Sequence, residues 1–340
     1  MAVTLGARAF TKIVAKGAAF GSTASFTGTT GEIMMTDAVG VLDAGVAVDT
    51  NADRSAGVRA GVLGGNVTVT AKNPLLTLGE APVSMRNLPI YFNALKSITP
   101  SGAGPYTYVY SPTMTDVDTL VPQSFLVQDG LQKFTIDGCV PTELSLSAAS
   151  DGLLQCGSSW AGRALATSTD ANTAAISASQ AFIPGRLFTA KYHTSFISQD
   201  GTAVTGTPTA YTSFITDFAL TLTPGAAPIM AMSGSLNSGG VAYQAGFTGT
   251  FSLTVASNAT AVAAFPVADI GTVKYLWLTA TDGTYSFTFA LAAVLTSRSV
   301  IGGEGDGGAI VETADFELCY DTTSGKVFEA TVVSPLSVTP

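Results

Sequence analysis

The stretch that decides the fold is Phe134–Arg163, FTIDGCVPTELSLSAASDGLLQCGSSWAGR, which has the pattern of a complete β-hairpin. Leu144 and Leu146 alternate with polar residues, and this two-residue period places both leucines on one face of a strand. Asp151 and Gly152 supply a turn, because glycine tolerates positive φ and aspartate can bond its own backbone. Beyond the turn, alternate residues share one face: Leu154, Cys156, Ser158 and Trp160. The hairpin is scaffold, since none of these inward residues is a reactive group.

The composition favours a protein whose surface is largely neutral. The chain has 340 residues, of which 46% are hydrophobic and 11% charged, and it contains 36 glycines. Soluble domains usually carry about a quarter of charged residues. Surfaces poor in lysine and glutamate are expected where much of the outside is buried against identical neighbours. An extracellular β-protein has a similar composition, so both interpretations stay open.

The net charge of -9 argues against several classes of partner. Sequence-independent binding of DNA or RNA needs clustered lysine and arginine, and no such cluster is present. No run of about 18 apolar residues occurs, so no membrane attachment is expected. The N-terminal stretch has no uninterrupted apolar core of the signal-peptide kind, because basic residues are spaced through it. We therefore expect synthesis in a cytoplasm without export.

Alternation of apolar and polar residues predicts strands through most of the chain. Pro74–Lys96 instead fits a helix, or two short helices interrupted at Pro82 and Pro89, and Ala261–Ile270 could be a second helix. Three further elements are expected: a turn at Asp137-Gly138, a loop or linker over Ala164–Ser179, and a final hairpin formed by Asp315–Cys319 and Val327–Val333. The fold class expected is mainly β with short flanking helices.

The order of these elements suggests a duplication. Residues 67–71, VTVTA, resemble residues 252–256, SLTVA, and 143–156 resembles 315–330 with a turn glycine in each. The prediction is two similar β-domains in series. The boundaries are an N-terminal arm at 1–31, a first β-domain at 32–165, a linker and connecting strand at 166–211, and a second β-domain at 212–340.

The N-terminal arm carries three basic residues spaced four apart, Arg8, Lys12 and Lys16. A short helix would place all three on one face. The other interpretation is an extended arm that becomes ordered on contact with a neighbouring subunit.

Residues able to carry catalysis are few. His193 is the only histidine, and no GxSxG nucleophile elbow is nearby. The pair Asp116 and Asp118 lies in a loop, and a spacing of two residues does not imply a cleft. Three cysteines, Cys139, Cys156 and Cys319, form no CxxC motif and are interpreted as buried strand residues. We therefore expect no enzyme, no cofactor and no metal site.

Six acidic residues and no basic one lie between Arg298 and Lys326. They are Glu304, Asp306, Glu312, Asp315, Glu317 and Asp321. One interpretation is a solvated loop. The other is that part of this run faces a channel through which a polyanion passes, with Glu304, Asp306 and Glu312 as the candidate lumen-facing acids.

Around the central hairpin the sequence resembles the tail tube proteins of long-tailed, siphovirus-type bacteriophages. The resemblance is carried by PYTYVYSP (105–112), SFLVQDG (124–130), IDGCVPTELSLS (136–147) and GSSWAGR (157–163). A second set, FITDFALTLTP (214–224) and GFTGTFSLTV (246–255), matches the later half of larger members. These are loose patterns that together extend over most of the chain.

The resemblance implies two tandem tail-tube domains, each a β-sandwich or barrel flanked by a short helix. It also implies a virion protein, made in the host bacterial cytoplasm, that self-assembles into rings stacked as the hollow tail tube. Duplicated members build a pseudo-hexameric ring from three chains, with a hexamer of single chains as the alternative. The implied partners are other copies, the tape measure and terminator proteins, and DNA that passes through without specific binding. Arg8, Lys12 and Lys16 would then belong to an inter-ring arm.

Two other classes remain. An exported cell-surface or pilus-like β-sandwich adhesin shares the composition, but the missing signal peptide and disulfide framework disfavour it. A glycan-active enzyme would need Asp116 and Asp118, and no cleft signature supports that reading.

Overall fold

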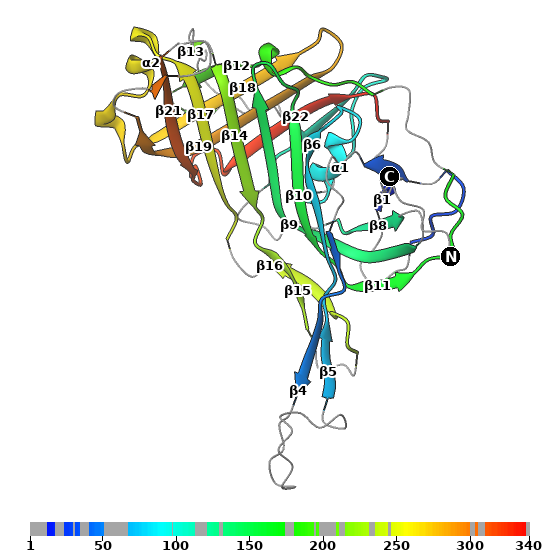
Figure 1. The fold of residues 1–340 in the computed structure, drawn as a ribbon. Helices are drawn as coiled ribbons and strands as arrows, with labels where there is room; N and C mark the ends of the chain where they lie inside the picture. Colours follow the sequence, from blue (N-terminus) through cyan, green and yellow to red (C-terminus); the bar gives the residue numbers. More distant parts are fainter. Residues whose placement is uncertain are drawn as a thin grey trace, which may run out of the picture.

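The computed structural model describes residues 12–17, 24–29, 31–34, 41–50, 67–96, 98–112, 121–128, 132–173, 180–193, 195–196, 209–210, 215–230, 235–243, 246–299, 303–304 and 310–337. The fold is mainly β, with most strands joined in one branched antiparallel sheet (Figure 1). Within the described residues, no helix is long and apolar enough to span a membrane.

The first half of the chain contains eleven of these strands and one helix. In order they are β1 Lys12–Gly17, β2 Glu32–Met34, β3 Val41–Asp43, β4 Val46–Thr50, β5 Val67–Lys72, β6 Leu75–Pro82, α1 Leu88–Asn93, β7 Tyr106–Tyr110, β8 Gln123–Gln128, β9 Lys133–Ala149, β10 Gln155–Ala161 and β11 Ala164–Thr167.

The second half follows a 3-10 turn, η2 at Gly185–Leu187. Its elements are β12 Thr189–His193, β13 Thr209–Ala210, β14 Ile215–Thr223, β15 Ala226–Ile229, β16 Gly240–Tyr243, β17 Thr248–Ala256, α2 Ala259–Ala264, η3 Val267–Asp269, β18 Val273–Thr281, β19 Ser286–Arg298, β20 Gly303–Glu304, β21 Ile310–Leu318 and β22 Phe328–Ser334.

The predicted central hairpin is confirmed as β9 and β10. Ser158 lies opposite Leu144, and Cys156 lies opposite Leu146. The residues expected on the inner face, from Leu144 to Trp160, are buried. The expected turn at Asp137-Gly138 is wrong, because β9 continues without interruption from Lys133 to Ala149. Gly138 has a positive φ of 63° within this strand.

The two halves share one series of strand pairings. In the first half β1 pairs with β2 and β8, β8 with β9, β9 with β10 and β11, β10 with β6, β6 with β3, and β4 with β5. In the second half β12 pairs with β13 and β18, β18 with β19, β19 with β21 and β22, β21 with β17, β17 with β14, and β15 with β16. A helix follows the corresponding strand in each half: α1 follows β6, and α2 follows β17.

Two backbone details repeat along with the pairings. Gly45, between β3 and β4, and Gly225, between β14 and β15, both have positive φ, at 57° and 71°. Each glycine therefore turns the chain out of the main sheet and into a separate two-stranded hairpin. In both cases the hairpin then returns the chain to the main sheet.

The sequence matches proposed for the duplication fall on the wrong strands. Residues 67–71 belong to β5, which pairs with β4 in a separate sheet, whereas 252–256 belong to β17 in the main sheet. The expected final hairpin is also wrong, because β21 and β22 both pair with β19, end to end along one edge. Local alternation predicted these strands but carries no information on their partners.

Pro74–Lys96 is a helix only in its second part. Its first part is strand β6, in which Leu76 and Leu78 are buried and Leu75 and Thr77 are exposed. The helix α1 begins at Leu88 after Asn87 and has Pro89 in its first turn. The second expected helix is present as α2 followed by η3.

The halves meet at one junction and share one apolar core. β9 of the first half pairs with β14 of the second, so the main sheet continues from β6 to β21. β7 pairs with β22 across the same boundary. A single cluster of buried side chains runs from Ile13 to Leu336. The expected connecting segment contributes to it through Ile183 and Phe188.

Candidate functional site

One face of the main sheet is open, and it crosses both halves of the molecule. The strands lie in the order β3, β6, β10, β9, β14, β17, β21, as their pairings show. Along each strand, apolar residues point to the core and small or polar residues point outward. This alternation is the normal pattern of an antiparallel sheet with one solvated face.

The register places the outward residues in rows that run across the strands. One row is Ser145, Thr221, Thr250 and Glu317. The next is Gln155, Ser147, Ala219, Ser252, Asp315 and Ser297. A hollow of about 360 Å³ lies on this face over β14, β17 and β21. We call this surface the open face.

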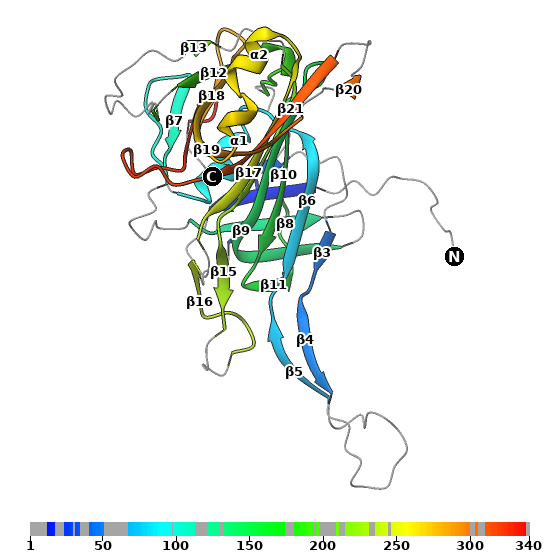
Figure 2. The same ribbon diagram turned by 90° about the vertical axis from the view of Figure 1, so that its left-hand side faces the viewer.

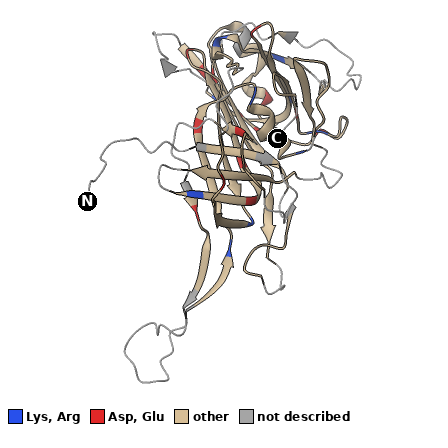
Figure 3. Ribbon diagram, turned by 90° about the vertical axis from the view of Figure 1, so that its right-hand side faces the viewer, with Lys and Arg blue, Asp and Glu red and all other residues tan. Residues whose placement is uncertain are grey.

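Charge on the open face has one sign. Among the described residues, six carboxylates project from it: Asp43, Glu80, Glu143, Asp217, Asp315 and Glu317. β6, β10, β14, β17 and β21 contain no lysine or arginine. Figure 3 shows how sparse charged positions are along the described ribbon. The face is therefore hydroxyl-rich and acidic, a combination that hydrates well and repels polyanions.

Of the three acids expected to face a lumen, only Glu312 has a described side chain, and it does not lie on this face. Glu312 is buried on the core side of β21, where it pairs with Arg298 and accepts a hydrogen bond from Ser257. It is therefore not presented to solvent in the single chain, and it does not lie on the open face. The side chain of Glu304 and the whole of Asp306 lie outside the described residues.

The register signal that separates these acids was present in the sequence. On β21 the even-numbered residues Ala314 and Phe316 are buried, so odd-numbered Asp315 and Glu317 point outward. Counting by two from the apolar residues selects Asp315 and Glu317 and rejects Glu312. Residues 310–318 of the acidic run therefore form a strand with two different faces, and not a solvated loop.

Arg298 and Glu312 hold helix α2 against the sheet. Arg298 donates hydrogen bonds to the carbonyl oxygens of Val262 and Phe265 at the C-terminal end of α2. A cation is stabilised there, because the last carbonyls of a helix have no partner within the helix. Glu312 neutralises the buried guanidinium.

Two hairpins project from the same side of the molecule. β4–β5 and β15–β16 each form their own two-stranded sheet, and both extend below the body in Figure 2. Exposed apolar side chains are concentrated on and beside them: Val46, Val48, Ile229, Met230 and Leu236. The hairpins touch at their bases, where the Lys72 amide donates to the carbonyl of Leu236 over 2.9 Å.

The N-terminal basic residues divide between two regions. Arg8 lies outside the described residues. Lys12 and Lys16 are in β1, a strand rather than a helix or a free arm, although their side chains are not described. β1 lies between β2 and β8, and Ile13, Val14 and Ala15 are fully buried. This part of the expected arm is thus integral to the fold.

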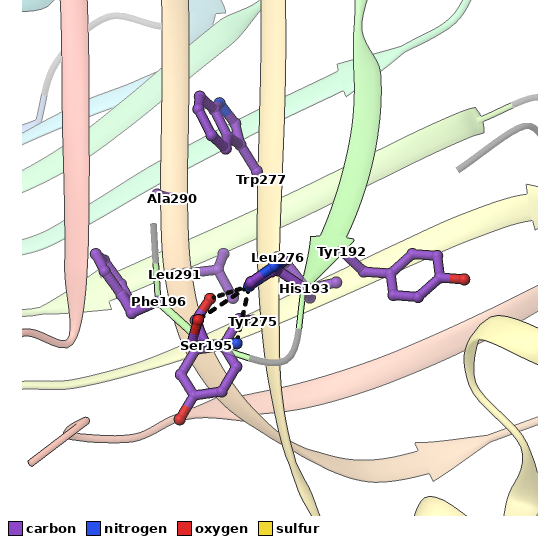
Figure 4. A pocket seen from close by; sticks show the side chains of 9 residues that line it. All are labelled: Tyr192, His193, Ser195, Phe196, Tyr275, Leu276, Trp277, Ala290 and Leu291. Carbon is purple, nitrogen blue, oxygen red and sulfur yellow. Dashed lines mark hydrogen bonds between the residues drawn. The ribbon is translucent and has the colours of Figure 1, made fainter. Parts of the chain in front are cut away.

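His193 makes a local hydrogen bond to its own loop and lies beside a very small cavity (Figure 4). Its Nδ1 accepts a hydrogen bond from the backbone amide of Ser195, two residues away, over 3.0 Å. The adjoining cavity measures about 10 Å³, room for about one water molecule. Its lining includes no carboxylate. Asp116 and Asp118 lie outside the described residues.

The cysteines and metal-binding residues show no assembled centre in the described part of the chain. Cys139, Cys156 and Cys319 are free thiols. Burial raises the pKa of Cys139 and Cys156 well above the usual value, which disfavours the reactive thiolate. No group of His, Cys, Asp or Glu able to hold a metal is found among the described residues.

No protein-family model matches this chain. No curated protein matches it either.

Proposed function

We propose that the chain is the structural subunit of a phage tail tube, assembling laterally into rings that stack into a hollow conduit. The observation that carries the proposal is the open face, a continuous sheet surface that spans both halves. Its strands β3, β6, β10, β14, β17 and β21 contain no lysine or arginine, and the one lysine of β9, Lys133, lies in the part of that strand that pairs with β8. Lining a channel with this face would explain both its chemistry and its extent. The protein would then reside in the virion, with the tape measure and terminator as tail partners.

A conduit for DNA must let the duplex move without holding it. DNA carries one negative charge per about 1.7 Å of helix axis, and each lysine or arginine that contacts a phosphate adds salt-dependent affinity. The open face offers hydroxyl groups and six carboxylates instead. Such a wall would keep the duplex hydrated and away from the protein surface.

We further propose that the halves are tandem copies of one β-domain. The shared series of pairings and the repeated Gly45 and Gly225 turns support this. Three chains would then present six equivalent units around a channel. The hexamer of chains remains the alternative and would place twelve units in a ring.

The projecting hairpins are candidates for contacts between stacked rings. Both extend to the same side, and their exposed valine and isoleucine side chains would be buried against the next ring. An arm formed by residues 1–11, including Arg8, would act beside them. Lys12 and Lys16 begin and nearly end β1, so they would anchor that arm.

Two truncations distinguish the role of the arm in stacking from the role of β1 in the fold. Removing residues 1–11 should leave a folded subunit that forms rings but stacks poorly. Removing residues 1–17 also deletes three fully buried residues of β1, so the subunit itself should lose its cooperative unfolding transition. Circular dichroism and electron microscopy of both truncations test this, and normal tubes from the shorter truncation would contradict the arm.

The main test is electron microscopy of the purified chain at rising concentration. Hollow tubes with threefold rings would support tube and tandem domains together, whereas sixfold rings of single chains would keep the tube and discard the trimer. A monomer at every concentration would contradict the proposal and favour the adhesin class.

DNA retention tests the lining. Ala219 and Thr250 are exposed on the open face. Tubes carrying Ala219→Lys and Thr250→Lys should retain duplex DNA at low salt and release it at high salt, whereas wild-type tubes should not retain it. Val46→Lys on a hairpin is the matched control for added charge elsewhere.

A further inference from the structure

The helical segments of the two halves differ in what covers them. α1 is buried along its whole length. In α2, in η3 and between η3 and the start of β18, four apolar side chains are exposed by between 42% and 48%: Val262, Val267, Ile270 and Val273. We call residues 259–273 the α2–η3 segment. In Figure 1 α2 lies at the outer end of the sheet, and α1 lies in the interior.

The inner contact of each helical segment is the same. Tyr91 of α1 lies near Trp160 of β10, with ring centroids 6.5 Å apart. Phe265, at the end of α2, lies 5.3 Å from Phe316 of β21. β10 and β21 have matching partners in the two halves. Each helical segment therefore has an aromatic contact with the corresponding strand of its own sheet.

The outer cover of α1 combines strand β7 of the first half with strand β19 of the second half. Phe92 stacks on Phe287 of β19 at 6.2 Å and on Tyr110 of β7 at 5.4 Å. Tyr110 also donates a hydrogen bond to the carbonyl of Pro89 over 2.9 Å. β7 in turn pairs with β22 of the second half. The junction thus consists of one half laid over the helix of the preceding half.

The residue that matches Phe287 in the first half is Phe134. Each is the second residue of its strand, β9 or β19, and each is followed by threonine. Phe134 lies between β8 and β11. Phe287 lies between the corresponding strands of the second half, β18 and β22. Phe287 is buried at 1%, whereas Phe134 is only half-buried.

We infer that the internal junction is repeated between chains, with the Phe134 region of one copy covering the α2–η3 segment of the preceding copy. This inference deepens the proposed ring assembly and rests on it. The occupant is a second copy of this chain because the chain already shows the complementary contact between its own halves. The contact is heterologous, so it generates a ring if the rotation closes.

A free edge agrees with this geometry. At the internal junction β14 pairs with β17 on one side and β9 on the other. Its counterpart β3 pairs with β6, and its other edge has no partner among the described strands. That edge faces the side on which the preceding copy would lie. Pairing it would extend the open face from one chain to the next.

Charge placed on the exposed helical segment tests the inference. Val267→Glu should leave the unassembled subunit folded, because the side chain is exposed there. Burying an unpaired carboxylate in the interface should raise the concentration needed for ring formation by more than about tenfold. Val48→Glu on the projecting hairpin is the matched control, and it should impair stacking while rings still form.

Cross-linking tests the direction of the contact. In a Cys319→Ser background, chains with Val267→Cys and chains with Phe134→Cys are prepared separately. A mixture should form disulfide-linked dimers on oxidation, and neither chain alone should do so. A link formed by Val267→Cys alone would show an isologous contact and overturn the inference.

The outcomes keep the two proposals apart. If wild type forms tubes and Val267→Glu forms them at the same concentration, the inference falls and the tube proposal stands. If wild type forms no rings at any concentration, the tube proposal falls, and the inference falls with it.

Discussion

The two halves of this molecule share a series of strand pairings, but different interactions hold the helix of each half against the sheet. α1 is fixed by aromatic packing of Tyr91 on Trp160 of its own half and of Phe92 on Phe287 of the second half. α2 is exposed on its outer side and is fixed from within by the buried pair Arg298 and Glu312. The difference teaches that matching strand order does not imply that the same interactions stabilise the helical segment of each half.

The largest expected effect comes from breaking the aromatic cover of α1. Phe92→Ala should destabilise the unassembled subunit by about 3–5 kcal/mol, because the side chain is fully buried and leaves a cavity. Val262→Ala in α2 should change stability by less than about 0.5 kcal/mol. Urea unfolding of both variants measures the contrast. Equal losses would show that α2 is covered in the free subunit.

A comparable effect is expected from the ion pair under α2. Arg298→Met should cost about 3 kcal/mol or more, because it leaves the Glu312 carboxylate buried without its cation. Replacing both residues, Arg298→Met with Glu312→Leu, should recover much of that loss, since a packed apolar pair of similar volume is often neutral. Chemical unfolding of the single and double variants decides this. A double variant that is no more stable than the single would assign the cost to the lost helix cap instead.

Local sequence pattern predicted the elements of this fold better than their partners. The assignment of Leu144 to Trp160 is correct because alternation within a strand is a local property. β6 was mistaken for helix because Leu75, Leu76 and Leu78 satisfy both periods. The β9–β14 junction joins residues far apart in sequence, and no local pattern encodes such a pairing, whereas the inward position of Glu312 follows from the two-residue period of β21. The tube function remains a proposal that rests on the open face.

A smaller effect is expected at the two turn glycines. Gly45→Ala and Gly225→Ala should each lose about 1–2 kcal/mol, because L-residues are strained at positive φ. Gly45→Ala should cost more, since its new Cβ would lie 1.7 Å from the carbonyl oxygen of Asn73. Thermal unfolding compares the pair. If Gly225→Ala were the more harmful, the hairpin bases would not be held in the same way.

The smallest expected effect is on alkaline stability, and it compares one tyrosine from each half. Burial raises the pKa of Tyr108 to about 12, and its hydroxyl donates to the carbonyl of Leu336. Burial also raises the pKa of Tyr275 to about 12, with a further contribution from the carboxylate of Asp321, which accepts its hydrogen bond over 3.0 Å. Both tyrosines are therefore neutral in the folded state at pH values where an unfolded tyrosine ionises.

The sign of the pH dependence follows from linkage. A pKa that is higher in the folded state gives stability that is complete below the ordinary value of 10 and is lost as pH rises toward about 12. Tyr108→Phe and Tyr275→Phe should each flatten that loss, and each should remove one late step from the phenolate absorbance titration. Because Asp321→Asn removes the neighbouring charge from Tyr275 alone, it should lower the pKa of Tyr275 and leave the Tyr108 step in place. A simultaneous shift of both steps would show global alkaline unfolding rather than separate titration of the two halves.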